Sequence, residues 1–181
     1  MRINVAQLLR SAIGSTRDYE VKQVIDVTGD GVNTLVEGKV SLMRTDRGIL
    51  VKGELATGVE LTCSRCLSPF HCPLALNIEE EYFPTTDVVS GAPLYLPEEA
   101  GSFTIDEHHE LDLTEAIRQC ALLALPMKPL CRESCAGLCP RCGHNLNLGA
   151  CNCRPEADPR WSELSRLASA GDDRSGEEKG T

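Results

Sequence analysis

Residues 130–153 read LCRESCAGLCPRCGHNLNLGACNC and hold six of the ten cysteines of this 181-residue chain. The packing of a hydrophobic core does not require so many cysteines close together. Disulfide bonds and metal sites do require them. The spacing of these cysteines in pairs favours a metal ion over disulfides.

The first predicted metal site consists of two closely spaced cysteine pairs. Cys139 and Cys142 are separated by two residues, so both thiolates can point at one ion, and Gly143 allows the backbone to turn tightly behind them. Cys151 and Cys153 form the second pair, after a polar turn. These four thiolates complete the tetrahedral set that Zn²⁺ prefers, and the sequence therefore predicts a zinc site here.

Four cysteines then remain in two further pairs, and they predict a second zinc site. Its ligands come from segments far apart in the sequence: Cys63, Cys66, Cys131 and Cys135. Such a site would fasten the cysteine-rich segment to the rest of the fold, so metal binding would contribute to folding. The alternative is one ion bound within the segment, with the other pairs free and with the ligands Cys131, Cys135, Cys139 and Cys142.

Length and composition indicate a single main core in a cytoplasmic protein. A chain of this length with 41% hydrophobic residues can bury one good core, and aliphatic side chains must fill it because only 4% of the residues are aromatic. The first residues lack the apolar stretch of a secretory signal, and no run of about 18 apolar residues predicts a membrane span. Ten cysteines in such a chain indicate the reducing cytoplasm, where thiols stay available for metal.

The charge of the chain limits its partners. A formal charge of −9 argues against a protein that holds nucleic acid by bulk electrostatics. Residues 79–115 contain eleven Asp and Glu residues and no Lys or Arg, whereas residues 126–160 carry a small basic excess. The acidic run is interpreted either as a solvated loop or as a contact surface for a basic protein.

Alternating apolar residues predict a β-rich first half. The expected strands span residues 19–25, 36–42, 49–56 and 70–78, and a short edge strand is expected at 103–105. A short amphipathic helix is expected at 4–11, a loop at 80–101, and a helix at 113–125 that begins with a capping box of Asp112 and Glu115. Cys72 and Cys120 fall on apolar faces and are expected in the core.

The predicted fold class is α+β, with an antiparallel β-rich sheet or barrel-like body, one packed helix and a C-terminal zinc-ribbon-like segment. The body is expected to span residues 1–125. Residues 126–169 are expected to form the cysteine-rich zinc-binding segment, docked on the body and ending in a short helix that starts at Asp158 and Pro159. Residues 170–181 are small, charged and featureless and are expected to be disordered.

Catalytic motifs are absent from the sequence. The triplet His108-His109-Glu110 matches half of the zinc deaminase signature, but the P-C-x-x-C half is missing because Pro140 follows Cys139 instead of preceding it. Four thiolates around a zinc ion also leave no coordination position for water. The protein is therefore expected not to be an enzyme.

A thiol redox reaction is a further candidate for the Cys63-Ser-Arg-Cys66 motif. This motif lies at the expected tip between two strands, whereas the dithiols of redox proteins are activated at helix N-termini, where the helix dipole lowers the thiol pKa. Zinc binding is therefore the better interpretation of this pair.

The motifs of the chain follow a distinctive order: Cys63-Ser-Arg-Cys66, Leu123-Ala-Leu-Pro126, Pro129-Leu-Cys131, Gly137-Leu-Cys-Pro-x-Cys-Gly-x-Asn-Leu-Asn147, Cys151-x-Cys153 and Asp158-Pro-Arg160. In this order they resemble the YceD family, over most of residues 19–167. The resemblance implies a cytosolic bacterial protein, with plastid relatives, that is linked to accumulation of the 23S ribosomal RNA of the large subunit.

The resemblance implies a role in ribosome biogenesis and does not imply a particular chemical reaction. Together with the cysteine pairs it predicts a non-catalytic factor in large-subunit biogenesis, with one or two Zn²⁺ ions, that supports accumulation or processing of 23S rRNA. The expected partner is a basic ribosomal protein or a pre-ribosomal particle, held against the acidic residues 79–115. Contacts to RNA or to the partner are expected from Arg132, Arg141, Arg154 and Arg160. The alternatives are a free-standing zinc-ribbon nucleic-acid-binding protein and a thiol redox protein.

Overall fold

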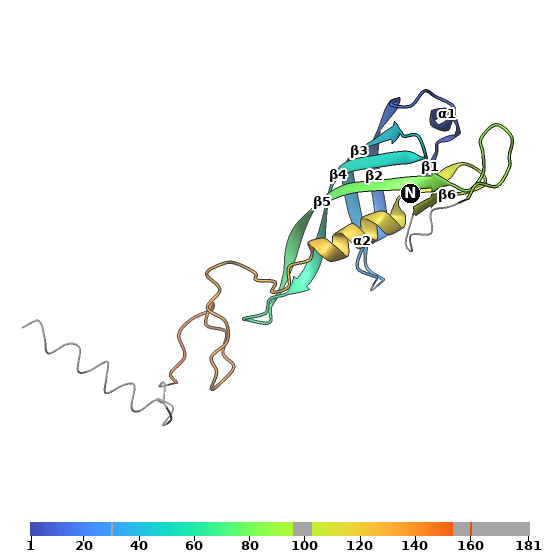
Figure 1. Cartoon of the computed structure of the whole chain (residues 1–181). Helices are drawn as coiled ribbons and strands as arrows, with labels where there is room; N and C mark the ends of the chain where they lie inside the picture. Colours follow the sequence, from blue (N-terminus) through green and yellow to red (C-terminus); the bar gives the residue numbers. More distant parts are fainter. Residues whose placement is uncertain (30, 96–102, 154–159, 161–181) are drawn as a thin grey trace, which may run out of the picture. The chain divides into compact units, whose positions relative to one another are not determined.

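The chain divides into two compact units, Met1–Cys135 and Ala136–Thr181. The structure is a computed structural model and describes residues 1–29, 31–95, 103–153 and 160 (Figure 1). The first unit includes Cys131 and Cys135, which were predicted to belong with the cysteine-rich segment that follows the body. The helix expected from Asp158 and the tail expected at 170–181 lie outside the described residues.

In the described residues of the first unit, the strands form one sheet in the order β1-β7-β6-β5-β4-β3-β2. Their bounds are β1 (Arg2–Asn4), β2 (Thr16–Asp26), β3 (Asn33–Arg44), β4 (Ile49–Thr62), β5 (Pro69–Pro84), β6 (Phe103–Ile105) and β7 (Glu110–Asp112). Neighbouring strands are antiparallel except for β5 and β6, which are parallel. With β1 and β2 as its two edges, the curved sheet is an open half-barrel (Figure 1).

The long central strands form where the sequence alternates with period two. The inward residues of β3 and β4 supply much of the core, and Val36, Leu42 and Val51 are completely buried. The predicted strands 36–42, 49–56 and 70–78 are confirmed as parts of β3, β4 and β5. The antiparallel β-rich part of the predicted fold class is therefore confirmed.

Two short helices accompany the sheet, α1 (Ala6–Leu9) and α2 (Thr114–Ala124). The predicted helix 113–125 is confirmed to within one residue at each end, and Ile117 and Ala121 of α2 are buried in the same core as the strands. Cys72 and Cys120 are half-buried against this core. In the described part of the chain, neither helix is long and apolar enough to cross a membrane.

The predicted capping box of α2 is wrong. Asp112 accepts a hydrogen bond from the Thr114 N–H at 2.9 Å, but Glu115 does not return to the helix start. The Glu115 carboxylate instead accepts hydrogen bonds from Arg118 at 2.9 and 2.8 Å and from Gln119 at 3.0 Å. These side chains lie one turn further along the helix, where residues three and four apart meet.

Long-range strand pairing explains the other differences from the predicted elements. The expected helix 4–11 shrinks to α1, because Arg2–Asn4 pair with β7, a strand that was not predicted. The expected loop 80–101 begins later, because β5 continues to Pro84 and buries Tyr82. The strand 103–105 is not at an edge but lies between β5 and β7.

Glycine on the inner face of the sheet makes room for neighbouring side chains. A Cβ atom added at Gly53 of β4 would lie 2.7 Å from Cγ1 of Val40, which is buried on the adjacent strand β3. Gly58 of the same strand differs, since the three atoms nearest to its added Cβ all belong to the ring of the exposed His71. Alanine substitutions at Gly53 and Gly58 can therefore be compared: both remove a glycine from β4, but only the one at Gly53 crowds a buried side chain.

We expect Gly53→Ala to destabilise the protein by about 1–3 kcal/mol, because the stiff Val40 side chain and the close-packed core cannot yield without strain. Gly58→Ala should leave the free energy of unfolding nearly unchanged, because His71 can rotate into solvent. Chemical denaturation of both variants measures this difference. Equal stability of the two variants would contradict the proposed crowding at Gly53.

Candidate metal centres

The first cluster of thiols, here called the body cluster, lies within the first unit. Its members are Cys63, Cys66, Cys131 and Cys135, whose Sγ atoms all lie within 4.8 Å of one another. Cys63 Sγ lies 3.8 Å from Cys135 Sγ, and Cys66 Sγ lies 3.7 Å from Cys131 Sγ. Four sulfurs placed tetrahedrally at 2.3 Å around a zinc ion would be separated by about 3.8 Å. The spacing of these thiols therefore fits a tetrahedral zinc ion.

Hydrogen bonds join the two segments that carry the body cluster. Cys63 and Cys66 lie in the turn between β4 and β5, as predicted, and the other two cysteines follow α2. The Ser64 N–H donates to the Pro129 carbonyl at 2.8 Å, and the Arg65 guanidinium donates to the Cys135 carbonyl at 3.0 Å. The two segments thus meet through protein contacts that involve no metal.

The second cluster, here called the C-terminal cluster, lies within the second unit. Its members, also within 4.8 Å of one another, are Cys139, Cys142, Cys151 and Cys153. The Ala136 N–H donates to the Asn147 side-chain oxygen at 2.9 Å, and Leu146 N–H donates to the Gly137 carbonyl at 2.9 Å. Between residues 136 and 153 the regular structure consists of one isolated β-bridge, so these bonds hold a loop that encloses the thiols.

The two C-x-x-C turns have the same hydrogen-bond pattern. Leu67 N–H donates to the Cys63 carbonyl at 3.0 Å, and Gly143 N–H donates to the Cys139 carbonyl at 2.9 Å. In each turn the N–H of the first cysteine also donates to the carbonyl five residues later, at 3.0 and 2.8 Å respectively. One local fold therefore presents a pair of thiols in both clusters.

The backbone at the end of each turn is left-handed. Gly143 has a φ of 69°, and Leu67, at the equivalent position, has a φ of 57°. A leucine in this conformation is strained by roughly 1–2 kcal/mol, whereas glycine adopts it freely. The first C-x-x-C motif, Cys63-x-x-Cys66, is therefore harder to recognise as this turn from its sequence, because Leu67 follows it. The second motif, Cys139-x-x-Cys142, is followed by Gly143, the residue that the turn favours.

Both clusters contain thiols whose pKa is lowered, namely Cys63 and Cys66 in the body cluster and Cys139 in the C-terminal cluster. The pKa of Cys63 is lowered to about 6, first by the backbone N–H of Cys131 and then by that of Cys66. The pKa of Cys139 is likewise lowered to about 6, chiefly by the backbone N–H of Cys142. Hydrogen bonds to the charged form stabilise a thiolate, which is the form that binds metal.

A second thiol in each cluster keeps its proton. The pKa of Cys131 is raised to about 12, mainly because burial disfavours the charged form. The pKa of Cys153 is also raised to about 12, mainly by its hydrogen bond with Cys142. A divalent cation would supply the positive charge that lets these protons leave, so the charge of both clusters is compatible with a bound metal ion.

The two clusters differ in exposure. In the body cluster Cys63, Cys66 and Cys135 are all at least 95% buried. In the C-terminal cluster only Cys139 is buried, and Cys142 is exposed. An ion in either cluster would have four sulfur ligands and no position left for water, which is the arrangement of a structural site and not of a catalytic one.

The structure brings together the thiols of each predicted set and does not group them as the single-ion alternative required. Of the arginines predicted to contact RNA or a partner, Arg132, Arg141 and Arg160 are exposed, and Arg154 lies outside the described residues. Arg65 was not predicted, because nothing in its sequence context indicates that its side chain reaches the Cys135 carbonyl.

The region that contains both clusters matches a known protein family. The profile of the family described as large ribosomal RNA subunit accumulation protein YceD matches residues 51–168, which include all eight cluster cysteines. The chain belongs to the YceD family. The family is named for accumulation of the RNA of the large ribosomal subunit, and the thiol clusters of this member are able to hold metal ions.

Relatives from bacteria and plants share this YceD region. An uncharacterized protein of Mycobacterium tuberculosis is 33% identical over 120 residues, covering 66% of this chain and 56% of the relative. A chloroplastic large ribosomal RNA subunit accumulation protein YCED homolog 1 of Arabidopsis thaliana is 26% identical over 186 residues (91% and 56%), and its Zea mays counterpart is 28% identical over 155 residues (72% and 53%). The chain spans about half the length of these relatives. No solved structure matches the chain.

We expect the zinc-loaded protein to carry two ions per chain. Cys63→Ser and Cys139→Ser should each retain one, because each removes a ligand from a different cluster. Cys72→Ser is the matched control, since this half-buried thiol belongs to neither cluster, and it should retain two. Native mass spectrometry counts the ions. Loss of both ions from either cluster variant would contradict two independent sites.

We also expect a chelator to remove the two ions in order. The C-terminal cluster should lose its ion first, because Cys142 is exposed and can be replaced by a chelator ligand more easily than a buried cysteine. The release of zinc into a colorimetric chelator should therefore be biphasic. Cys139→Ser should abolish the fast phase and Cys63→Ser the slow one, and the reverse assignment would refute the order.

Proposed function

We propose that this chain is a non-catalytic zinc-binding factor of large-subunit biogenesis in the cytoplasm. It supports accumulation or processing of 23S rRNA by binding a basic ribosomal protein or the pre-ribosomal particle. Two Zn²⁺ ions, one in each cluster, give rigid shape to segments that contain little regular structure.

The sulfur geometry of the clusters is the observation that carries the metal part of the proposal. Separations of 3.7 and 3.8 Å in the body cluster are those of a tetrahedral four-thiolate zinc site. Zinc bound there would act as a cross-link between the β4–β5 turn and the segment after α2. Because four thiolates saturate the ion, the zinc would stabilise the fold and would not activate a water molecule.

The family and the charge of the chain support the ribosomal part. The family description and the names of the plant relatives both refer to RNA of the large ribosomal subunit. A chain with a formal charge of −9 is repelled by bare RNA at long range, whereas many basic surfaces in an assembling ribosomal particle would attract it. A basic protein partner is therefore favoured over direct binding of free RNA.

Much of the acidic run 79–115 is already paired within the protein. Arg2 contacts Glu110 at 3.7 Å and Asp112 at 3.5 Å, and Asp112 also contacts the amino terminus at 3.0 Å. Further pairs join Lys52 to Glu79, Arg47 to Glu81 and Arg118 to Glu115. The run as a whole is therefore a weaker candidate for the partner surface than its sequence indicated.

The cellular test compares depletion of the protein with rescue by defined variants. Depletion should lower the amount of mature 23S rRNA while 16S rRNA remains, and the tagged protein should cosediment with large-subunit precursors. The wild type and Cys72→Ser should restore 23S rRNA. A double Cys63→Ser, Cys66→Ser variant should not, because it removes half of the body cluster.

Three results would overturn this function. Unchanged 23S rRNA on depletion, with no cosedimentation, would remove the ribosomal role. Tight binding of bare RNA that falls steeply with salt would favour the nucleic-acid-binding alternative. Rapid alkylation of cysteines in the zinc-loaded protein, unaffected by a chelator, would favour a thiol redox protein, because zinc-bound thiolates react slowly until the metal is removed.

A further inference from the structure

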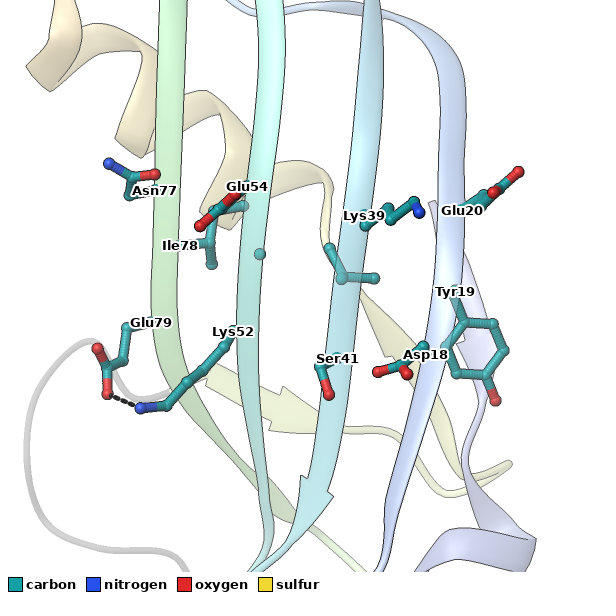
Figure 2. A pocket seen from close by; sticks show the side chains of 12 residues that line it. Asp18, Tyr19, Glu20, Lys39, Ser41, Lys52, Glu54, Asn77, Ile78 and Glu79 are labelled. Atoms are coloured by element: carbon teal, nitrogen blue, oxygen red, sulfur yellow. Dashed lines mark ion pairs between the residues drawn. The ribbon is translucent and has the colours of Figure 1, made fainter.

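The face of β2–β5 that is turned away from α2 carries a wide trough bordered by polar side chains. Figure 2 shows this face in front of the strands, with α2 behind them. The trough has a volume of about 690 Å³ and crosses four neighbouring strands of the sheet. Neither helix in the described residues covers it.

Strand register places the side chains of the trough in two parallel rows. One row crosses the strands as Glu20, Lys39, Glu54 and Asn77. The other row crosses them as Asp18, Ser41, Lys52 and Glu79. Between the rows lie buried residues such as Val40, Gly53 and Ile78, which belong to the core face. The floor of the trough is therefore sheet backbone, and its two walls are polar side chains about 7 Å apart along each strand.

Four carboxylates face two lysines on these walls, so negative charge is in excess. Lys52 is paired with Glu79 at 2.7 Å, and in the next row outside the trough Lys22 is paired with Glu37 at 2.8 Å. Three exposed carboxylates of the walls form no ion pair in the described part of the chain, and only one lysine, Lys39, remains to balance them. These carboxylates belong to Asp18, Glu20 and Glu54.

We propose that this trough binds an extended, lysine- and arginine-rich polypeptide segment of a partner protein. The excess of carboxylates attracts basic side chains and repels the phosphates of RNA. The same excess opposes pairing with a second copy of this chain, because two acidic faces would meet. Charge complementarity therefore selects a basic protein segment as the occupant.

The shape of the trough fits an extended chain. Four strands about 4.8 Å apart span about 14 Å, which an extended segment of four or five residues can cover. The sheet backbone in the floor is already hydrogen-bonded between strands, so recognition must come from the carboxylates and from contact with the aliphatic stems of the basic side chains. Because exposed ion pairs are individually weak, binding should be modest in affinity and sensitive to salt.

This inference deepens the proposed function, and it rests on that function for the ribosomal origin of the partner. The proposed partner surface is the trough and not the acidic run 79–115 as a whole. Glu79 is the one residue of that run that lines the trough. The chemistry of recognition itself depends only on the trough.

The direct test is an NMR titration of the zinc-loaded full chain with a synthetic ten-residue peptide of alternating lysine, arginine and glycine. Amide shifts should be confined to β2–β5 around Glu20, Gly53 and Glu54. A peptide with acetylated lysines and citrulline in place of arginine should cause none. Glu20→Gln and Glu54→Gln should each weaken binding by about fivefold, since an exposed ion pair contributes about 1 kcal/mol.

The control for net charge is Glu107→Gln, because Glu107 is exposed outside the trough in the turn before β7. It should bind the peptide as the wild type does. The inference is overturned if the shifts map to another surface or if Glu107→Gln weakens binding as much as the two trough variants. It is also overturned if single-stranded RNA of the same length shifts the same amides at equal concentration.

A cellular arm separates the failure of this inference from the failure of the proposed function. The double charge reversal Glu20→Lys, Glu54→Lys should fold, bind two zinc ions and lose cosedimentation with large-subunit precursors. If the wild type and this variant both cosediment, the trough is not the partner surface, although the ribosomal role stands. If the wild type does not cosediment, the ribosomal role fails, and the peptide titration still decides whether the trough binds basic segments.

Discussion

The closeness of four sulfur atoms in the body cluster links two segments of the first unit that lie far apart in the sequence. Cys66 and Cys131 are 65 residues apart in the chain and Cys63 and Cys135 are 72 apart, yet their sulfur atoms are separated by 3.7 and 3.8 Å respectively. A cross-link over a loop of that length removes chain entropy from the unfolded state worth about 4 kcal/mol, by analogy with a disulfide. A cation in the cluster would therefore stabilise the unit more than a local knuckle could.

The same turn structure presents cysteine ligands in both clusters, although the two clusters have different surroundings. Both C-x-x-C turns present their thiols through the same pair of backbone hydrogen bonds, and both end in a left-handed residue. The surroundings differ, because the body cluster is fixed between a β-hairpin and a helix end, whereas the C-terminal cluster is enclosed by a short loop. Both clusters offer four cysteine ligands, but those of the body cluster are more buried. We therefore expect the C-terminal cluster to release its zinc ion more easily.

Periodicity and cysteine spacing predicted the local features of the molecule. The alternation in β3, β4 and β5, the apolar stripe of α2 and the pairing of thiols within each C-x-x-C motif are all visible in consecutive residues. The pairing of Arg2–Asn4 with β7 is not, because nothing in either short segment reports its distant partner. The charges Glu79, Glu80 and Glu81 likewise concealed that β5 continues, since strand pairing in this region outweighs the poor β-propensity of glutamate.

We propose that each cluster holds one zinc ion through four sulfur atoms. X-ray absorption spectroscopy at the zinc edge of the fully loaded protein tests it most directly. We expect a single shell of four sulfur neighbours at about 2.3 Å for both ions. Nitrogen or oxygen ligands in that shell, or fewer than four sulfurs per ion, would contradict it.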